Sequence, residues 1–171
     1  MATISFPKDF LWGSATSAYQ VEGGIDNNDW AKKYPAGRAC DQYNLYEQDF
    51  DLLKKLYQNA YRFSIEWSRI EPKEGEFDEA EIEHYRKVLL ALQERGITPV
   101  VTLWHWTLPL WFEEKGGWAS KEAVEDFKRY TRRVVEELGD LVEFWITLNE
   151  PMNHVGLGYI AGAFPPHKKN I

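Results

Sequence analysis

Short apolar segments alternate with longer amphipathic segments along most of this chain. The apolar segments, interpreted as strands, span 9–20, 59–67, 97–106 and 141–151. The amphipathic segments, which carry apolar residues at helical spacing, span 44–58, 77–96 and 120–140. Strands that are separated by helices in this way pair in parallel through right-handed crossovers. The alternation therefore predicts an α/β fold of successive βα units on one parallel sheet.

Two of the predicted helices carry signals at both ends. Asp78 is a suitable N-cap for the helix that follows it, and Gly96 is a suitable stop. Ser120 and Gly139 repeat the same arrangement around the next helix. These signals predict where the helices begin and end.

The third and fourth predicted strands are apolar on both alternating faces, as in "PVVTLW" and "FWITL". Such strands suit a sheet that is covered by helices on one side and by its own packed interior on the other, as in a closed (β/α)8 barrel. Active sites of these barrels lie at the carboxyl ends of the strands. Polar and aromatic side chains follow the four strands here, namely Gln20, Glu22, Glu66, Arg69, His105, Trp106, Asn149 and Glu150. We expect them to converge on one pocket.

Composition excludes several classes of partner. The 171 residues carry a net charge of -7 and no basic stripe, which argues against nucleic acid and against an anionic membrane surface. The chain shows no signal-peptide pattern and no apolar run of membrane-spanning length, so a cytoplasmic location is expected. The single Cys40 and four dispersed histidines give no metal-binding spacing, and no metal or other cofactor is expected. Cys40 is expected to be a packed thiol.

Glu150 is the most informative carboxylate because it ends an apolar strand. Pro151 follows it, which predicts an extended backbone at Glu150. Tryptophan and other apolar neighbours would desolvate the carboxyl group and favour its protonated form, as suits a general acid. The alternative is a glutamate that caps a helix or pairs with a lysine.

Three further side chains could orient sugar hydroxyl groups by hydrogen bonding: Gln20, His105 and Asn149. His105 lies between two tryptophans in "LWHWTLP", so the alternative is a structural histidine satisfied within the core. The aromatic content of 15% is compatible with core packing or with apolar surfaces for sugar rings.

Arg62 alternates with Tyr61 and Phe63 in "YRFSIEW" and should face the opposite side of its strand. An arginine aimed into a barrel needs an anionic partner, because burying an unpaired charge is costly. Two partners are possible: a carboxylate elsewhere inside the barrel, or Glu66 in a structural ion pair.

Four ordered segments carry a family resemblance: "FPKDFLWGSATSAYQVEGG", "YRFSIEWSRIEP", "TLWHWTLPLWF" and "WITLNEP". They resemble the signature segments of glycoside hydrolase family 1, the β-glucosidase and β-galactosidase family. The similarity runs from Phe6 to about Pro166. It implies a (β/α)8 barrel that hydrolyses β-glycosides with retention of configuration.

The resemblance also implies roles for individual residues. Glu150 would be the catalytic acid/base. The residues that would bind the sugar are Gln20, His105, Trp106 and Asn149. Arg62 would orient the nucleophile.

The chain departs from the family pattern in one respect: it has no TENG-like segment, which carries the family's nucleophilic glutamate. A full barrel needs about 250 residues, so residues 1–171 are expected to form a single N-terminal half barrel of four βα units. We expect it to supply the acid/base half of the site, to be inactive alone, and to associate with a complementary C-terminal half or with itself through exposed barrel edges. The alternative is a non-catalytic half barrel for sugar binding or assembly.

Overall fold

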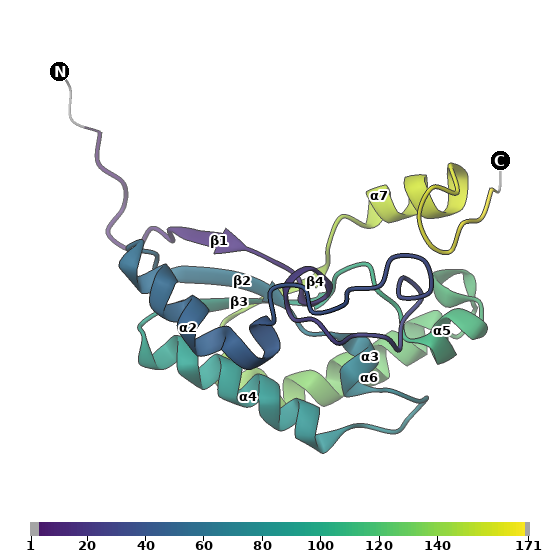
Figure 1. Cartoon of the computed structure of the whole chain (residues 1–171), viewed down its shortest axis with the longest axis horizontal. Coiled ribbons are helices and arrows are strands. Elements are labelled where there is room, and N and C mark those ends of the chain that lie inside the picture. The colour runs from purple at the N-terminus through teal and green to yellow at the C-terminus, as the bar shows by residue number, and fades with distance from the viewer. Residues whose placement is uncertain (1–3, 170–171) are drawn as a thin grey trace.

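The computed structural model describes residues 4–169, in which four parallel strands form one sheet in the order β1-β2-β3-β4 (Figure 1). The strands are β1 (Gly13–Ala15), β2 (Ala60–Ser64), β3 (Thr98–Trp104) and β4 (Phe144–Leu148). The helices are α1 (Ala18–Val21), α2 (Gln42–Lys55), α3 (Trp67–Ile70), α4 (Glu79–Glu94), α5 (Leu110–Glu114), α6 (Ala123–Leu138) and α7 (Pro151–His154). Shorter turns are η1 (Gly117–Ala119), η2 (Gly139–Leu141) and the π-helical η3 (Val155–Ile160). The predicted parallel sheet of βα units is confirmed.

The helix-end signals are confirmed at three of four positions. The side chain of Asp78 accepts hydrogen bonds from the amides of Ala80 and Glu81 at the start of α4. Gly96, at φ +68°, follows the end of α4, and Gly139 is the C-cap of α6. The prediction for Ser120 is wrong, because the N-cap of α6 is Glu122. Ser120 instead accepts a hydrogen bond from the Glu122 amide and stabilises the preceding turn.

The first strand is much shorter than the predicted 9–20, because the chain turns after three paired residues. The amide of Ala18 donates to the hydroxyl of Ser64 at 2.8 Å, and α1 begins there. Gln20 therefore lies on a short helix after β1. Gly13 is required in β1, since a Cβ atom there would lie 2.3 Å from the carbonyl oxygen of Ala60.

The two faces of the sheet have different surroundings. On the helix-covered face, β2 and β3 contribute Tyr61, Phe63, Val101 and Leu103 to a core closed by α2, α4 and α6 (Figure 1). We call the other side the open face, defined by the register row Ala15, Arg62, Val100 and Phe144. Arg62 therefore lies on the side opposite Tyr61 and Phe63, as predicted.

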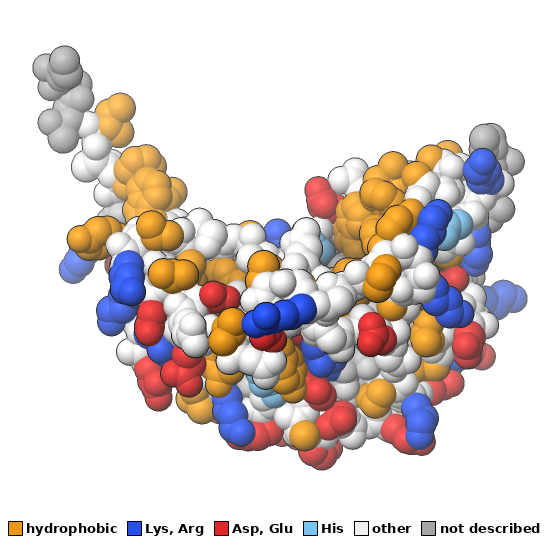
Figure 2. All heavy atoms as spheres, viewed as in Figure 1, with side chains coloured by type: hydrophobic (Ala, Val, Ile, Leu, Met, Phe, Trp, Pro, Cys, Tyr) orange, Lys and Arg blue, Asp and Glu red, His pale blue; other side chains and the backbone are white. Residues whose placement is uncertain are grey.

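The edge strands β1 and β4 each have one neighbour among the described residues. All residues of β1 are exposed, and Phe144 of β4 is 41% exposed. No described residue covers the open side of β4, in agreement with the expected half barrel with exposed edge strands. The surface in Figure 2 is hollowed between the N-terminal arm and the lobe formed by α7 and η3, and hydrophobic side chains border the hollow on both sides.

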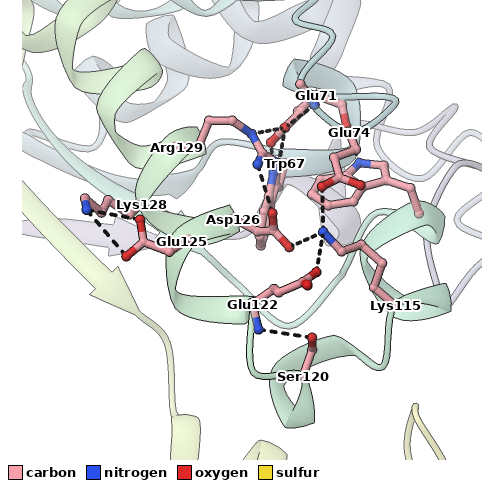
Figure 3. A network of polar contacts seen from close by, with 12 residues as sticks. Trp67, Glu71, Glu74, Lys115, Ser120, Glu122, Glu125, Asp126, Lys128 and Arg129 are labelled. Atoms are coloured by element: carbon pink, nitrogen blue, oxygen red, sulfur yellow. Dashed lines mark hydrogen bonds and ion pairs between the residues drawn. The ribbon is translucent and has the colours of Figure 1, made fainter.

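A buried ionic network joins the helices outside the sheet (Figure 3). Glu71, which is fully buried, accepts hydrogen bonds from Arg129 and from the indole of Trp67, each at 2.8 Å. Asp126 accepts from Arg129 and from Lys115, also at 2.8 Å. Every charge in this network therefore has an opposite partner.

Three sequence expectations concern the rest of the chain. Cys40 is exposed, so the prediction of a packed thiol is wrong. None of the helices within residues 4–169 has both the length and the apolar character needed to cross a bilayer. His, Cys, Asp and Glu side chains in that part of the chain form no group of three or more suited to a metal ion.

Candidate active site

The six predicted site residues gather at the carboxyl ends of the strands. They come from α1 (Gln20), β2 (Arg62), the turn after β3 (His105 and Trp106) and the turn after β4 (Asn149 and Glu150). A polar pocket is lined by Ala15, Thr16, Gln20, Arg62, His105, Asn149 and Glu150. The structure therefore brings residues up to 130 positions apart into one site.

Asn149 is the buried centre of this site. Its Oδ1 accepts a hydrogen bond from Arg62 at 2.6 Å, which fixes the orientation of the amide. Its Nδ2 lies 3.2 Å from both His105 Nε2 and Glu150 Oε2. Its backbone oxygen accepts from the indole nitrogen of Trp106 at 3.0 Å. One asparagine thus contacts four of the other five predicted residues.

His105 is neutral near pH 7. Burial, together with the nearby Arg62 charge, lowers the pKa of His105 to about 4, although Glu150 acts in the opposite direction. Because Asn149 Nδ2 is a donor, Nε2 of His105 accepts and Nδ1 carries the proton. That Nδ1 is buried and has no partner among residues 4–169. His105 is therefore only half satisfied, unlike a fully satisfied structural histidine.

Arg62 makes no ion pair with any described residue. Its Nε donates to Thr102 Oγ1 at 3.1 Å, and its terminal nitrogen donates to Asn149. The alternative ion pair with Glu66 is wrong, because Glu66 accepts instead from Ser68 and from the hydroxyl of Thr107. The guanidinium group remains on the open face without an anion.

Glu150 has neither the expected extended backbone nor a desolvated carboxyl group; it takes the helix-cap position of the alternative, although its side chain makes no capping hydrogen bond. Its backbone is left-handed, at φ +46° and ψ +52°, and it is the N-cap of α7, where Pro151 is the first helical residue. Proline disfavours the right-handed helical region at the preceding residue, and the chain avoids it here by turning left-handed instead of extending. The side chain is exposed, so the expected desolvation is absent. Its two oxygens accept from Asn149 and from Asn153, at 3.2 and 3.1 Å.

An aromatic pocket adjoins the polar one. Its lining is Ser17, Tyr19, Gln20, Trp30, His105, Trp106, Thr107, Glu150 and Phe164. The rings of Trp30, Trp106 and Phe164 pack together with centroids 5.1 to 6.1 Å apart. Glu150 lines both pockets, so its carboxyl group lies between a polar space and an aromatic one.

Sequence reasoning missed Trp30, Phe164 and Asn153. Trp30 and Phe164 lie in loops far from any strand end, so position gave no signal for them. The high aromatic content was the only indication that tryptophan or phenylalanine could form a binding surface. Asn153 could have been noticed as an amide three residues after a helix-capping acid.

Three polar residues expected at the pocket lie outside its lining. Glu22 and Arg69 form an ion pair at 3.0 Å, and Tyr85 donates to Glu22 at 2.8 Å. Burial raises the pKa of Glu22 to about 7 against the effect of Arg69. Glu66 is buried between Ser68 and Thr107. These residues support the strand ends and do not line either pocket.

The fold and site define the class of protein: a chain of βα units whose polar side chains and Trp106 gather at the carboxyl ends of the strands. The carboxyl ends of the strands are where the active sites of (β/α) barrels lie. The sequence profile of "Glycosyl hydrolase family 1" matches residues 2–171. This chain therefore belongs to glycosyl hydrolase family 1.

Individual relatives agree with this assignment. Beta-glucosidase A of Acetivibrio thermocellus is 37% identical over 187 aligned positions, which cover 100% of this chain and 42% of that protein. The structure of a beta-glycosidase from Pyrococcus horikoshii superimposes with a TM-score of 0.92 at 43% identity, covering 96% of this chain and 40% of that one.

A third relative was solved with a ligand. The beta-glucosidase from Thermotoga maritima in complex with deoxynojirimycin gives a TM-score of 0.92 at 39% identity, over 96% of this chain and 41% of that chain. The present chain thus spans about two fifths of the length of these relatives. The fold is that of the first βα units of a β-glycosidase barrel.

Proposed function

We propose that this chain supplies the acid/base half of a retaining β-glycosidase site that accepts β-glucoside-like substrates. The observation that carries the proposal is the position of Glu150, whose carboxyl group lies between a polar and an aromatic pocket and is held by two amides. A general acid must reach the oxygen that joins the sugar to its leaving group, and a carboxyl group between two adjoining pockets has that access.

The remaining predicted residues take roles that suit their contacts. Gln20, His105 and Asn149 would hydrogen-bond the sugar in the polar pocket. The ring of His105 lines both pockets, so it is placed to contact a sugar in either of them. Trp106 would offer its ring to the apolar face of the sugar.

Retaining hydrolysis requires a second carboxylate about 5 Å from the first. Among the described residues, Glu150 is the only carboxylate that lines the polar pocket. We propose that the nucleophile comes from a complementary half that covers the open face, and that Arg62 pairs with it there. The relatives' greater length and the exposed edge strands support this proposal.

The test compares the chain alone with a chimera in which it replaces the matched region of the Thermotoga relative. We expect no turnover of an aryl β-glucoside by the 171-residue chain and clear turnover by the chimera. Glu150→Gln should reduce turnover of the chimera by about 100-fold or more. The matched control is Glu143→Gln at an exposed glutamate outside both pockets, which should leave turnover unchanged. Turnover by the chain alone that disappears with Glu150→Gln would contradict the proposed split of the site.

A second candidate function is sugar binding without catalysis. It is favoured by the fact that Asn149, His105, Arg62 and Trp106 are already connected within this chain. Binding of deoxynojirimycin to the isolated chain, together with an inactive but folded chimera, would support this candidate over the first. Self-association would be seen as a dimer in sedimentation, where two copies would provide eight strands but no nucleophile.

A further inference from the structure

Among the described residues, the side chain of Asn153 forms a hydrogen bond with Glu150 and with no other side chain. Its Nδ2 donates to Glu150 Oε1 at 3.1 Å, while Asn149 donates to Oε2. The two amides therefore hold both oxygens of one exposed carboxyl group. Asn149 also accepts a hydrogen bond from Arg62. Among the described residues, the side chain of Asn153 hydrogen-bonds to the Glu150 carboxylate alone.

The same local arrangement occurs a second time in this chain. Asp41 is the N-cap of α2 at φ +56°, and Asn44, three residues later, donates to its Oδ1 at 2.7 Å. The other oxygen of Asp41 accepts from Arg38. The amide of Asn44 is the main reason that the pKa of Asp41 lies below its usual value, because a donor favours the ionised carboxylate.

The two arrangements differ in their surroundings. Asp41 and Asn44 lie outside the polar and aromatic pockets, whereas Glu150 lines both. Asn153 lines neither pocket, so it acts on the site through the carboxylate that it contacts. The pair at α2 is therefore a matched reference for the pair at α7.

We propose that Asn153 is a positioning residue that fixes the orientation of the Glu150 carboxyl group and favours its ionised state during turnover. This inference rests on the proposed function. In the first step, Glu150 gives its proton to the leaving oxygen as that bond to the anomeric carbon breaks and the second carboxylate bonds to the same carbon. In the second step, water gives a proton to ionised Glu150 as its oxygen displaces the second carboxylate. The amide of Asn153 stabilises the form that Glu150 takes between these steps.

Few other charged groups face this carboxylate. His105 stays neutral above about pH 5, since its pKa is lowered to about 4 by burial and by Arg62. Arg62 is connected to Glu150 through Asn149. Substitution of Asn153 therefore changes one donor on Glu150 and leaves the nearby charges in place.

The first experiment uses the 171-residue chain and the amide signals of its asparagines in NMR spectra recorded across the pH range. We expect the side-chain amide of Asn153 to shift as Glu150 ionises, and this shift to disappear in Glu150→Gln. The amide of Asn44 should keep its own response in both proteins, because its acceptor is Asp41. An Asn153 amide that responds identically in the two proteins would overturn the inference.

The second experiment measures the pH profile of the active chimera. Asn153→Val should lower kcat about 3- to 10-fold through lost positioning and move the alkaline limb up by about 0.5 pH unit, because the acid keeps its proton longer. Asn153→Asp, which has the same shape but a negative charge, should move it further. Asn44→Val is the control, with an unchanged profile expected.

The outcomes separate the two proposals. An unmoved alkaline limb in both Asn153 variants would overturn the inference and reduce Asn153 to a helix-end residue. A wild-type chimera that folds but is inactive at every pH would instead contradict the proposed function, and the amide titration alone would then decide whether Asn153 holds the carboxylate.

Discussion

The two faces of the sheet differ in how far this chain completes them. On the helix-covered face, Trp67 is 1% exposed among aromatic rings, and Glu71 has both a cation and an indole as partners. On the open face, Phe144 is 41% exposed and Arg62 has no anion among the described residues. The described residues thus close the outer layer, whereas they leave the inner layer open. Stability should therefore depend on the first face and function on the second.

The largest expected effect on stability comes from removing a packed ring on the helix-covered face, compared with a ring on the open face. Trp67→Ala should lower the free energy of unfolding by about 3–5 kcal/mol, because it leaves a cavity among buried rings. Phe144→Ala should cost less than about 1 kcal/mol in the isolated chain, since that ring is already in contact with water. Urea unfolding followed by circular dichroism measures both values.

The chimera provides the control for this pair. If a complementary half covers the open face, Phe144→Ala should cost about 2 kcal/mol more in the chimera than in the isolated chain. Equal costs of Trp67→Ala and Phe144→Ala in the isolated chain would contradict the comparison of the faces.

The next effect concerns charge. Glu71→Ala should destabilise the chain by about 2–3 kcal/mol, because the buried indole nitrogen of Trp67 loses its acceptor and Arg129 keeps only Asp126 as an anionic partner. Arg62→Met should cost only about 1 kcal/mol, since it removes two hydrogen bonds and no ion pair. The same unfolding measurement applies, with Lys87→Met at an exposed surface pair as the control near zero. A larger loss for Arg62→Met than for Glu71→Ala would mean that Arg62 has a structural anion in the isolated chain.

Much of the helix-covered face could be predicted from the sequence because its signals are local. The alternation of apolar and amphipathic segments specifies strands and helices, and Asp78 caps α4 with its own side chain. The prediction for Ser120 was wrong because α6 begins at Ala123, two residues after the start that an N-cap at Ser120 would give. The hydroxyl of Ser120 accepts from the amide of Glu122, which lies before the helix. The predicted length of β1 was wrong because a contact with β2 decides where the chain turns. Such a contact between distant residues cannot be read from the local sequence.

The membership of the site was predictable in part, since five of the eight residues expected to converge line a pocket, but its geometry was not. Residues after strand ends converge because parallel strands share one carboxyl edge, which brought Gln20, His105 and Glu150 together. The left-handed backbone of Glu150 depends on the helix that starts at Pro151, and its exposure depends on what covers the open face. Trp30 and Phe164 were missed because loops place them by tertiary contacts alone.

A smaller effect tests whether the α7–η3 lobe above the open face has its own packed interior. His154 is 3% exposed, packs edge-on against Trp104, and has no hydrogen-bond partner on either ring nitrogen within the described structure. Burial lowers its pKa to about 4. The folded state therefore binds a proton less readily than the unfolded chain. The free energy of unfolding is therefore unaffected by protonation of His154 above about pH 6.5, and it decreases as the pH falls from there toward 4.

His154→Leu should remove this decrease in the free energy of unfolding at acidic pH. The variant should match the parent chain near pH 7 and exceed it by about 1–2 kcal/mol at pH 4.5, measured as urea unfolding at both values. His167→Leu, at an exposed histidine, is the matched control and should show no such gain. A parallel pH dependence in the parent and in His154→Leu would show that His154 is solvated and that the lobe is not packed.

The smallest effect concerns the conformational cost of the candidate acid itself. Glu150 is held at φ +46°, a region that asparagine tolerates better than glutamate, and asparagine is also preferred at N-caps. Glu150→Asn should therefore stabilise the isolated chain by about 0.5–1 kcal/mol while it removes the acid/base group. The control is Glu143→Asn, at an exposed glutamate just before β4 without a positive φ, which should change stability by less than about 0.5 kcal/mol. A loss of stability in Glu150→Asn would mean that the carboxylate contributes to folding through its two amide partners, and the division between a stabilising outer face and a functional open face would then not hold at this residue.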